Sequence, residues 1–185
     1  MIQYAYDTRK NDYKGDFTKM KDLRIIPVTN MELVYSLVPV AEEIWREHYI
    51  PIIGEQQVEY MLEKFLSAEA LVEQINSGYE YFLLSYDYTF AGFAGIKEED
   101  GKLFLSKLYL YNEFRGKGIA SYMFQKFVEI CKMRELDKIW LTCNRHNTNS
   151  YEVYKHLGFV TVREEKADIG EGFVMDDFIM EYEVK

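Results

Sequence analysis

The chain has 185 residues, of which 48% are hydrophobic and 16% aromatic, enough to build one ordinary domain around a buried core. Its 31 acidic and 22 basic residues give a net charge of −9. This argues against a duplex nucleic-acid binder, because such a protein needs a positive surface to displace counterions from phosphates. The same charge favours a cationic ligand only weakly, since acidity also serves solubility alone.

The two cysteines, Cys131 and Cys143, both lie in apolar runs, and no pair of C-x-x-C spacings is present. We therefore expect buried free thiols in a reducing cytoplasm and no metal site. The first residues are polar and lack the apolar core of a signal peptide, and no uninterrupted apolar segment reaches the roughly 18 residues that a membrane span needs. These features predict a soluble cytoplasmic protein that does not enter a membrane.

The N-terminal part of the chain is expected to hold one strand followed by helices. Residues 1–20 are mostly polar and are interpreted as an N-terminal extension, which leaves residues 21–185 as a single domain. The β-branched run LRIIPV at 23–28 predicts the first strand. From residue 31 to residue 75 the apolar residues recur three and four apart, so two or three helices are expected, with a break at PIIGE, residues 51–55.

Beyond Gly78 the apolar period changes to two, which predicts strands. Three strands are expected in succession, in YFLLSYD, TFAGFAGIKE and KLFLSKLYLY, with hairpin turns such as EEDGK between them. A helix over 118–136, a strand in KIWLTCN, a short helix over 150–157 and two final strands, FVTVREE and FVMDDFIMEY, complete the chain. This order predicts a single α/β (α+β) domain, with helices on both faces of a central mixed, mostly antiparallel sheet.

The stretch FRGKGIASYMF places two glycines between a predicted strand and a predicted helix. Gly116 and Gly118 would leave backbone N–H groups exposed and let an anion approach, and the positive end of the following helix would point at the same place. The loop is therefore interpreted as a phosphate or pyrophosphate cradle, with a plain strand-to-helix connection as the alternative. The P-loop pattern and the dinucleotide-binding fingerprint are both absent.

A second stretch, HNTNSYEVYKHLGF, follows the next predicted strand. Asn149 and Glu152 stand at the spacing of a capping box, so we expect Asn149 to cap a short helix. Ser150 and Tyr154, four residues apart, would share one face of that helix. Polar side chains at the start of a helix and a phenol one turn further on would then lie close together.

Together the two stretches carry the patterns R-G-x-G-x-A and N-x-x-S-x-x-x-Y-x-x-x-G-F. The pair resembles the GNAT superfamily of acetyl-CoA-dependent N-acetyltransferases, whose order of strands and helices agrees with the one expected here from about Leu23 to Tyr182. The tail DIGEGFVMDDFIMEYE and the helix IWREHY are similar to bacterial spermidine/spermine acetyltransferases. The resemblance implies a GNAT-like domain with acetyl-CoA as co-substrate.

The resemblance also implies which residues hold the cofactor. Leu108, Tyr109 and Leu110 would pair their main chain with the pantetheine arm, and Asn147 would hydrogen-bond its amides, with Ser150 nearby. The pyrophosphate would be held by the loop formed by Arg115, Gly116, Lys117, Gly118, Ile119 and Ala120. For Asn147 the alternative is a role in helix entry, and for Lys117 it is a solvated side chain.

Tyr154 is the residue expected to do chemistry, as the general acid that protonates the departing thiolate, although most of the 16 tyrosines must be buried aromatics. The main-chain N–H of Leu110 is expected to stabilise the oxyanion. Some family members place a glutamate on the central strand as general base, but this strand has Lys107 and no carboxylate, so the base is not identified. The residues expected around the acceptor, each of which a solvated surface or core packing would also explain, are Glu43, Trp45, Glu47, His48, Tyr49 and Glu55.

The resemblance implies direct transfer of the acetyl group to a primary amine, of a polyamine or a similar small cation, in a ternary complex. Neither cysteine belongs to the motifs, so no covalent acetyl intermediate on sulfur is expected. Two alternatives stay open: a protein or peptide N-terminal acetyltransferase, and an acyl-CoA-binding protein without turnover. A homodimer is also compatible with the sequence.

Overall fold

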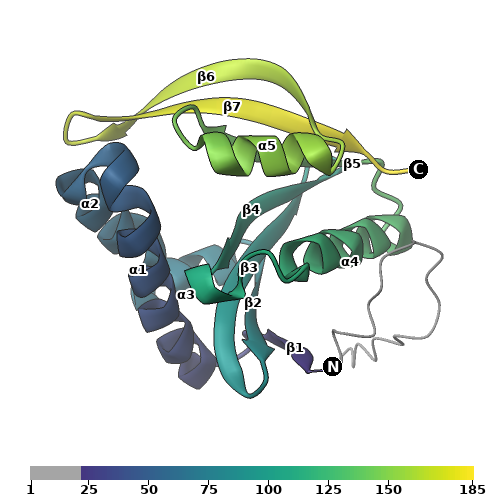
Figure 1. Cartoon of the computed structure of the whole chain (residues 1–185), viewed down its shortest axis with the longest axis horizontal. Helices are drawn as coiled ribbons and strands as arrows, with labels where there is room; N and C mark the ends of the chain where they lie inside the picture. The colour runs from purple at the N-terminus through teal and green to yellow at the C-terminus, as the bar shows by residue number, and fades with distance from the viewer. Residues whose placement is uncertain (1–21) are drawn as a thin grey trace.

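The computed structural model describes residues 22–185, which form one sheet with helices on both faces (Figure 1). The sheet has seven strands in the order β1-β2-β3-β4-β5-β7-β6. Every neighbouring pair is antiparallel except β4 and β5, which are parallel. The predicted fold class, a mixed and mostly antiparallel sheet with helices on both faces, is confirmed. The expected N-terminal extension, residues 1–20, lies outside the described residues.

The strands and helices follow the chain order that the sequence predicts. The strands are β1 (Leu23–Pro27), β2 (Tyr79–Tyr86), β3 (Thr89–Glu99), β4 (Lys102–Leu110), β5 (Lys138–Asn144), β6 (Val160–Gly170) and β7 (Phe173–Glu183). The helices are α1 (Met31–Ile53), α2 (Glu55–Leu66), α3 (Ala68–Asn76), α4 (Ile119–Met133) and α5 (Thr148–His156). A 3₁₀ turn at Asn112–Phe114 leads from β4 toward α4.

The first helical region begins at a side-chain cap and divides at a glycine. The Asn30 side chain caps α1, with its Oδ1 accepting a hydrogen bond of 2.9 Å from the Leu33 N–H. The predicted break falls at Gly54, whose φ of 84° ends α1 before α2 begins. Pro51 itself stays inside α1, because the φ of proline is close to the helical value and its missing N–H removes one hydrogen bond near the end of the helix.

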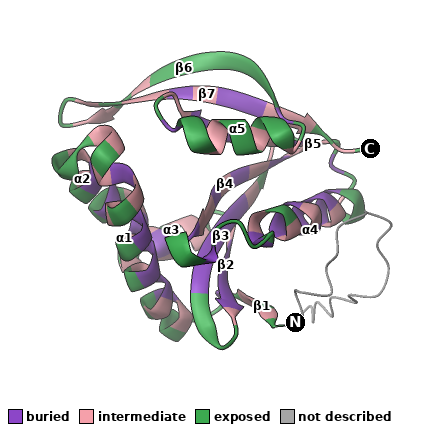
Figure 2. Cartoon of the chain, in the orientation of Figure 1, coloured by how far each residue is buried: buried purple, intermediate pink, exposed green. Residues whose placement is uncertain are grey.

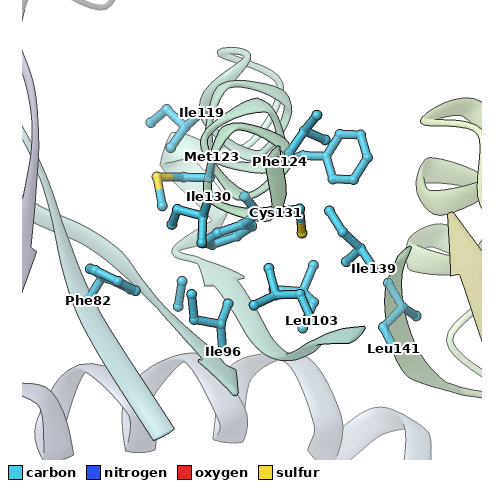
Figure 3. Close-up of a cluster of buried hydrophobic side chains, with 14 of the residues drawn as sticks. Phe82, Ile96, Leu103, Ile119, Met123, Phe124, Ile130, Cys131, Ile139 and Leu141 are labelled. Atoms are coloured by element: carbon cyan, nitrogen blue, oxygen red, sulfur yellow. The ribbon is translucent and has the colours of Figure 1, made fainter. Parts of the chain in front are cut away.

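The sheet separates two hydrophobic cores (Figure 2). On one face, α1, α2 and α3 pack on β2 and β3 through residues such as Leu37, Ile44 and Leu83. On the other face, α4 presents the predicted stripe of apolar residues, and each fully buried aliphatic side chain contributes about 1.5–3 kcal/mol. Figure 3 shows this second core, where α4 packs on the strands through Met123, Ile130, Cys131, Ile96, Leu103 and Leu141.

The two central strands, β4 and β5, pair only at one end. Their register consists of Leu103 with Ile139 and Phe104 with Trp140, and beyond these pairs the strands diverge. The pairing of β4 with β3 shifts by one residue between Leu105 and Lys107, which leaves Ser106 as a bulge. The bulge reverses the alternation of faces, and the divergence leaves the last residues of β4 without a neighbour on the side of β5.

Among the helices of residues 22–185, none is long and apolar enough to cross a membrane. Nor does this part of the chain gather three or more His, Cys, Asp or Glu side chains into a group that could hold a metal ion. Cys131 and Cys143 are buried free thiols, and burial raises the pKa of each to about 12. Neither thiol is therefore a ready nucleophile.

Candidate active site

A cavity of about 580 Å³ lies where β4 diverges from β5. It is bounded by the end of β4, the glycine loop, the first turn of α4, one face of α5 and one side chain of α1. Its lining residues are His48, Leu108, Tyr109, Leu110, Asn112, Arg115, Gly116, Gly118, Ile119, Ala120, Ser121, Asn149, Ser150, Val153, Tyr154 and Leu157. The cavity therefore brings the two sequence motifs together.

The glycine loop delivers the N-terminus of α4 to this cavity. Gly116 and Gly118 have φ values of 72° and 84°, a left-handed conformation that residues with a Cβ rarely adopt. Gly118 is the N-cap of α4, and no side chain caps the helix there. The first N–H groups of α4 have no carbonyl acceptor within the helix, and Ile119, Ala120 and Ser121 all line the cavity. The arrangement can therefore bind an anion such as a pyrophosphate.

The two basic side chains of the loop have different environments. Arg115 lines the cavity, and its Nε donates a hydrogen bond of 3.1 Å to the Leu110 carbonyl. Lys117 is exposed, lies 4.9 Å from the centre of the Phe114 ring and is not part of the lining. Of the two, Arg115 has the position of a cofactor contact, and Lys117 has that of a solvated side chain.

The end of β4 presents main-chain groups to the gap between the strands. The Tyr111 N–H donates to the Ala91 carbonyl of the β3 edge at 3.0 Å. Because hydrogen-bonding directions alternate along a strand, the N–H and C=O of Leu110 point away from β3 and toward the gap. The hydrogen bond from Arg115 to the Leu110 carbonyl agrees with this direction. Leu110 thus has an N–H group suited to an oxyanion or a cofactor amide.

The start of α5 differs from the sequence prediction. Asn147, not Asn149, is the N-cap, with its Oδ1 accepting a hydrogen bond of 3.3 Å from the Ser150 N–H. The prediction that Asn149 caps α5 is wrong, because the helix begins one residue after Asn147 and the Glu152 side chain pairs with Lys155 instead. Asn147 is only 4% exposed and is not part of the cavity lining, whereas Asn149 is.

Asn147 also fixes the protonation of His48. Since the Oδ1 of Asn147 faces the Ser150 N–H, its amide nitrogen faces His48 Nε2 at 3.0 Å, so Nε2 accepts and the ring proton of neutral His48 lies on Nδ1. Burial and the charge of Arg115 lower the pKa of His48. His48, which lines the cavity, is therefore neutral at neutral pH.

Tyr154 is half-buried on α5 and lines the cavity. Its ring packs edge-on against Phe159, with 5.6 Å between centroids. Burial raises the pKa of Tyr154, and the nearby Tyr49 and Cys143 raise it further. The phenol therefore stays protonated at neutral pH and can donate its proton to a strong base such as a thiolate.

Behind the cavity lies a group of three aromatic side chains, which we call the aromatic wall: Trp45 and Tyr49 of α1 and Tyr109 of β4. The Tyr49 and Tyr109 hydroxyl oxygens lie 3.1 Å apart, and the Trp45 ring centroid is 4.7 Å from that of Tyr49 and 5.7 Å from that of Tyr109. In the described chain, Trp45 Nε1 is the buried side-chain polar atom that no hydrogen bond satisfies. Tyr109 is the member that reaches the cavity.

The carboxylates predicted around the acceptor lie outside the cavity. Glu43 is exposed and accepts a hydrogen bond of 2.7 Å from the Tyr111 hydroxyl. Glu47 is exposed, and its charge favours the protonated form of the neighbouring His48. Glu55 lies in the first turn of α2. None of the three lines the cavity, so any contact with an acceptor would be made on the way in.

Lys107 lies on the central strand, where some family members have a glutamate as general base. Its side chain does not point into the cavity. It is buried, and its Nζ lies 3.3 Å from Gln74 Oε1 of α3 and 3.0 Å from Ser106 Oγ. Burial lowers its pKa to about 8. The bulge at Ser106 turns this side chain toward α3, and it is not part of the cavity lining.

The sequence missed five residues of the lining. They are Asn112, Ser121, Asn149, Val153 and Leu157. Three of them, with Ser150 and Tyr154, form one stripe of α5 at positions 149, 150, 153, 154 and 157, which is the spacing of a single helical face. That spacing could have extended the predicted site from Ser150 and Tyr154 along the helix.

Comparisons with known proteins agree with this geometry. The chain matches the acetyltransferase (GNAT) family over residues 38–159. A spermidine N(1)-acetyltransferase of Thermoplasma acidophilum is 27% identical over 165 residues, which are 86% of this chain and 95% of that protein. The crystal structure of the PaiA N-acetyltransferase of T. acidophilum, in complex with coenzyme A, is 26% identical with a TM-score of 0.72, over 87% of this chain and 98% of that one.

A more distant structure has the same fold. The structure of YncA from Salmonella typhimurium, with its cofactor acetyl-CoA, is 13% identical with a TM-score of 0.58, over 89% of this chain and 95% of that one. The family match extends from α1 to the end of the second motif and so includes the whole lining of the cavity. The chain therefore belongs to the acetyltransferase (GNAT) family, as its two motifs predict, and is an acetyltransferase.

Proposed function

We propose that the chain transfers the acetyl group of acetyl-CoA to a primary amine of a small polyamine-like cation, directly and within a ternary complex. The observation that carries this proposal is the lining of the cavity, which combines the uncapped N-terminus of α4 with the protonated Tyr154 phenol. An anion-binding helix terminus suits the pyrophosphate, and a protonated phenol suits the departing thiolate.

The cofactor would lie along the lining. The loop from Arg115 to Ala120 would hold the pyrophosphate with its main-chain N–H groups. The main chain from Leu108 to Leu110 would pair with the pantetheine arm, because β5 has diverged from β4 there. Asn149 and Ser150, rather than the buried Asn147, would contact the pantetheine amides, since they are the polar side chains of α5 on the lining.

Two groups would act on the thioester. The main-chain N–H of Leu110 would donate to the carbonyl oxygen as it becomes an oxyanion, and Tyr154 would protonate the sulfur as the tetrahedral intermediate collapses. The buried thiols support direct transfer, because Cys131 and Cys143 both have a pKa of about 12 and neither lines the cavity.

A polyamine is favoured as acceptor by one relative and by charge. The Thermoplasma relative, 27% identical, is a spermidine N(1)-acetyltransferase, and this chain has a net charge of −9. A cleft of about 910 Å³ beside α1, α2 and the β6–β7 turn adds local negative charge, because its lining holds four glutamates and only two basic side chains. The four are Glu42, Glu59, Glu63 and Glu171. Such a surface attracts a polycation and raises its rate of encounter.

The proposal is tested by supplying acetyl-CoA with a panel of acceptors and measuring both thiol release and the mass of the product. We expect spermidine or a related polyamine to gain one acetyl group per turnover. Acetylation of peptides with free N-termini, with every polyamine inert, would instead indicate a peptide N-terminal acetyltransferase. Stabilisation of the fold by acetyl-CoA without turnover of any amine would indicate an acyl-CoA-binding protein.

A further inference from the structure

Asp177 is the one carboxylate among residues 22–185 that is fully buried, with 6% of its surface exposed. Its neighbour Asp176 pairs with Arg145 at 3.0 Å and with Lys166 at 3.0 Å. Asp177 itself forms no ion pair with any residue in 22–185. Successive residues of a strand face opposite sides of the sheet, which is why two adjacent aspartates have such different surroundings. A buried carboxylate without a cation costs stability, so its presence points to a function.

Asp177 faces the aromatic wall. On β7, Met175 packs against the core under α1, and Phe178 packs against the core under α4 and α5. Asp177 lies on the same side of the strand as Met175, so it faces α1. It is paired with Asn144 at the end of β5, which is the end that has diverged from β4. The carboxylate therefore lies on the opposite side of the sheet from α4 and α5.

The groups that surround Asp177 come from several elements. Burial raises its pKa to about 6, helped by the charges of Asp176 on β7 and Glu165 on β6, while hydrogen bonds with Asn144 and Thr142 of β5 oppose the shift. Cys143 of β5 and Tyr49 of α1 complete these surroundings: burial raises the pKa of each to about 12, and the nearby Asp177 charge adds to the shift. A carboxylate with these neighbours is ionised at neutral pH and can still accept a proton.

The aromatic wall connects this carboxylate with the cavity. Tyr109 lines the cavity, and its hydroxyl lies 3.1 Å from that of Tyr49, which in turn interacts electrostatically with Asp177. Burial raises the pKa of both phenols, so both are neutral and each can accept one proton while passing on its own. The order from the cavity inward is Tyr109, Tyr49 and Asp177.

We propose, on the basis of the function proposed above, that Asp177 is the final acceptor of the proton that the amine substrate loses, and that Tyr109 and Tyr49 carry it there. The ammonium group gives a proton to the Tyr109 oxygen, and Tyr109 gives its own proton to Tyr49, whose hydroxyl lies 3.1 Å away. Tyr49 and Asp177 are not directly hydrogen-bonded, so Tyr49 gives its proton to a bridging water, which gives one of its own to the carboxylate. The general base that the central strand lacks is thus supplied by β7 through two phenols. Asp177 acts through them and does not touch the substrate.

The remaining steps balance the protons. The neutral amine attacks the thioester carbonyl, forming the C–N bond; the C–S bond then breaks, and the thiolate takes the proton of Tyr154. The second proton that the nitrogen loses restores Tyr154. Asp177 releases its proton to water after the product leaves, so one ammonium and one thioester yield one amide, one thiol and one proton.

The experiment compares two acceptors that differ in whether they must lose a proton before attack. One is the alkylamine that the wild type acetylates best, which is protonated near neutral pH, and the other is methoxyamine, which is already neutral there. For Asp177→Asn we expect kcat/KM toward the alkylamine to fall by about 10²-fold or more. We also expect the pH–rate profile of the wild type to show a limb near pH 6 and this limb to be absent in the variant. Toward methoxyamine we expect a change of only a few-fold. Tyr49→Phe should behave like Asp177→Asn, because it breaks the path between cavity and carboxylate.

Asp176→Asn is the matched control, since it removes an adjacent carboxylate that faces away from the aromatic wall, and it should keep the wild-type ratio between the two acceptors. Equal losses toward both acceptors in Asp177→Asn would indicate a structural residue and overturn the proposal. A wild-type limb near pH 6 retained in Asp177→Asn would do the same, and an unaffected Tyr49→Phe would exclude the phenol path. If the wild type binds acetyl-CoA but acetylates neither amine, the proposed function itself has failed, which is a separate result.

Discussion

The hydroxyl oxygens of Tyr49 and Tyr109 lie 3.1 Å apart although 60 positions separate the two residues in the chain. The bond joins α1, which covers one face of the sheet, to the strand that forms the cavity wall. Burial raises the pKa of both phenols, so one of them donates to the other. Tyr49 also raises the pKa of Tyr154, and Tyr154 raises that of Tyr109. Three neutral phenols therefore lie near one another on the side of the cavity where charge would develop during acyl transfer.

Replacing Tyr154 tests the general acid. Tyr154→Phe keeps the ring and removes the proton, so we expect kcat to fall by about 10²-fold or more while the affinity for acetyl-CoA stays nearly unchanged. Tyr151→Phe is the matched control, because Tyr151 is on the same helix and its hydroxyl bonds to Thr161 instead, at 3.3 Å. Steady-state kinetics with calorimetric titration of acetyl-CoA separates the two quantities. Parallel losses of affinity and rate would mean that Tyr154 only packs.

Replacing the two asparagines separates a structural role from a cofactor contact. Asn147→Ala removes the cap of α5 and leaves His48 without its amide partner, so we expect the free energy of unfolding to fall by about 1–2 kcal/mol. Asn149→Ala changes an exposed side chain of the lining, so stability should hold and acetyl-CoA binding should weaken. Urea unfolding and titration with acetyl-CoA measure the two effects. Weaker acetyl-CoA binding in Asn147→Ala, with unchanged binding in Asn149→Ala, would instead make Asn147 the pantetheine contact.

The parts of the site formed by residues close together in the sequence could be predicted. The parts that depend on contacts between distant segments, such as strand register and helix packing, could not. Two glycines between a strand and an apolar helical stripe specify the loop at Gly116 and Gly118, because turn geometry and helix periodicity are short-range properties. The fold class could be predicted in the same way, from the order in which helical and strand spacings of apolar residues follow one another along the chain. The N-cap of α5 was assigned to the wrong asparagine because Asn147 and Asn149 both lie near the start of the helix. Only the hydrogen bond from the Ser150 N–H to the Asn147 side chain identifies the true cap.

Asp177 could not be found from the sequence for a different reason. The dipeptide at 176 and 177 is two identical residues, and only the register of β7 decides which carboxylate meets Arg145 and which one is buried. Tyr49 and Tyr109 were predicted as separate site residues, but the contact between their hydroxyl groups could not be predicted, since it requires α1 to pack on β4. Long-range packing, rather than composition or motif, defines this half of the site.

The glycine loop offers a matched pair for testing cofactor binding. Gly116 lines the cavity and Gly101 lies in the β3–β4 turn, yet both have a φ of +72° and neither would bring a Cβ within 4 Å of another group. Alanine at either position should therefore cost a similar strain of about 1–2 kcal/mol. Only Gly116→Ala should also weaken acetyl-CoA binding, because its Cβ would project where the pyrophosphate is proposed to lie. Equal thermal shifts with acetyl-CoA in both variants would argue against the loop as the cradle.

Salt dependence tests the attraction of a cationic acceptor. Glu43 and Glu47 are exposed and one turn apart on α1, so replacing both with glutamine should raise KM for spermidine more than it lowers kcat and should reduce the loss of kcat/KM with added salt. Glu69 and Glu73, exposed and one turn apart on α3, give a control with the same change in net charge. Kinetics at several salt concentrations make the comparison. An identical response of the two double variants would assign the effect to net charge alone.

Asp177 should make the fold less stable as its carboxyl ionises. Its pKa is raised in the folded chain from 3.8 to about 6, so the folded state holds the proton more tightly than the unfolded state. The free energy of unfolding therefore contains a contribution that is fully present below about pH 4 and is lost as pH rises through about 6. Asp177→Asn keeps the shape without the charge, so at neutral pH it should raise the free energy of unfolding, by up to about 3 kcal/mol.

The measurement is urea unfolding of the wild type and Asp177→Asn near pH 4 and near pH 7, with the gain expected only at the higher value. Asp176→Asn should show no such gain, because Arg145 and Lys166 lower the pKa of Asp176 and its ionised form is the stabilised one. A gain in stability combined with a loss of acetyl transfer would be the behaviour of a group kept for function at the expense of the fold. A variant that is less stable than the wild type at both pH values would show instead that the Asp177 carboxylate holds β5 and β7 together.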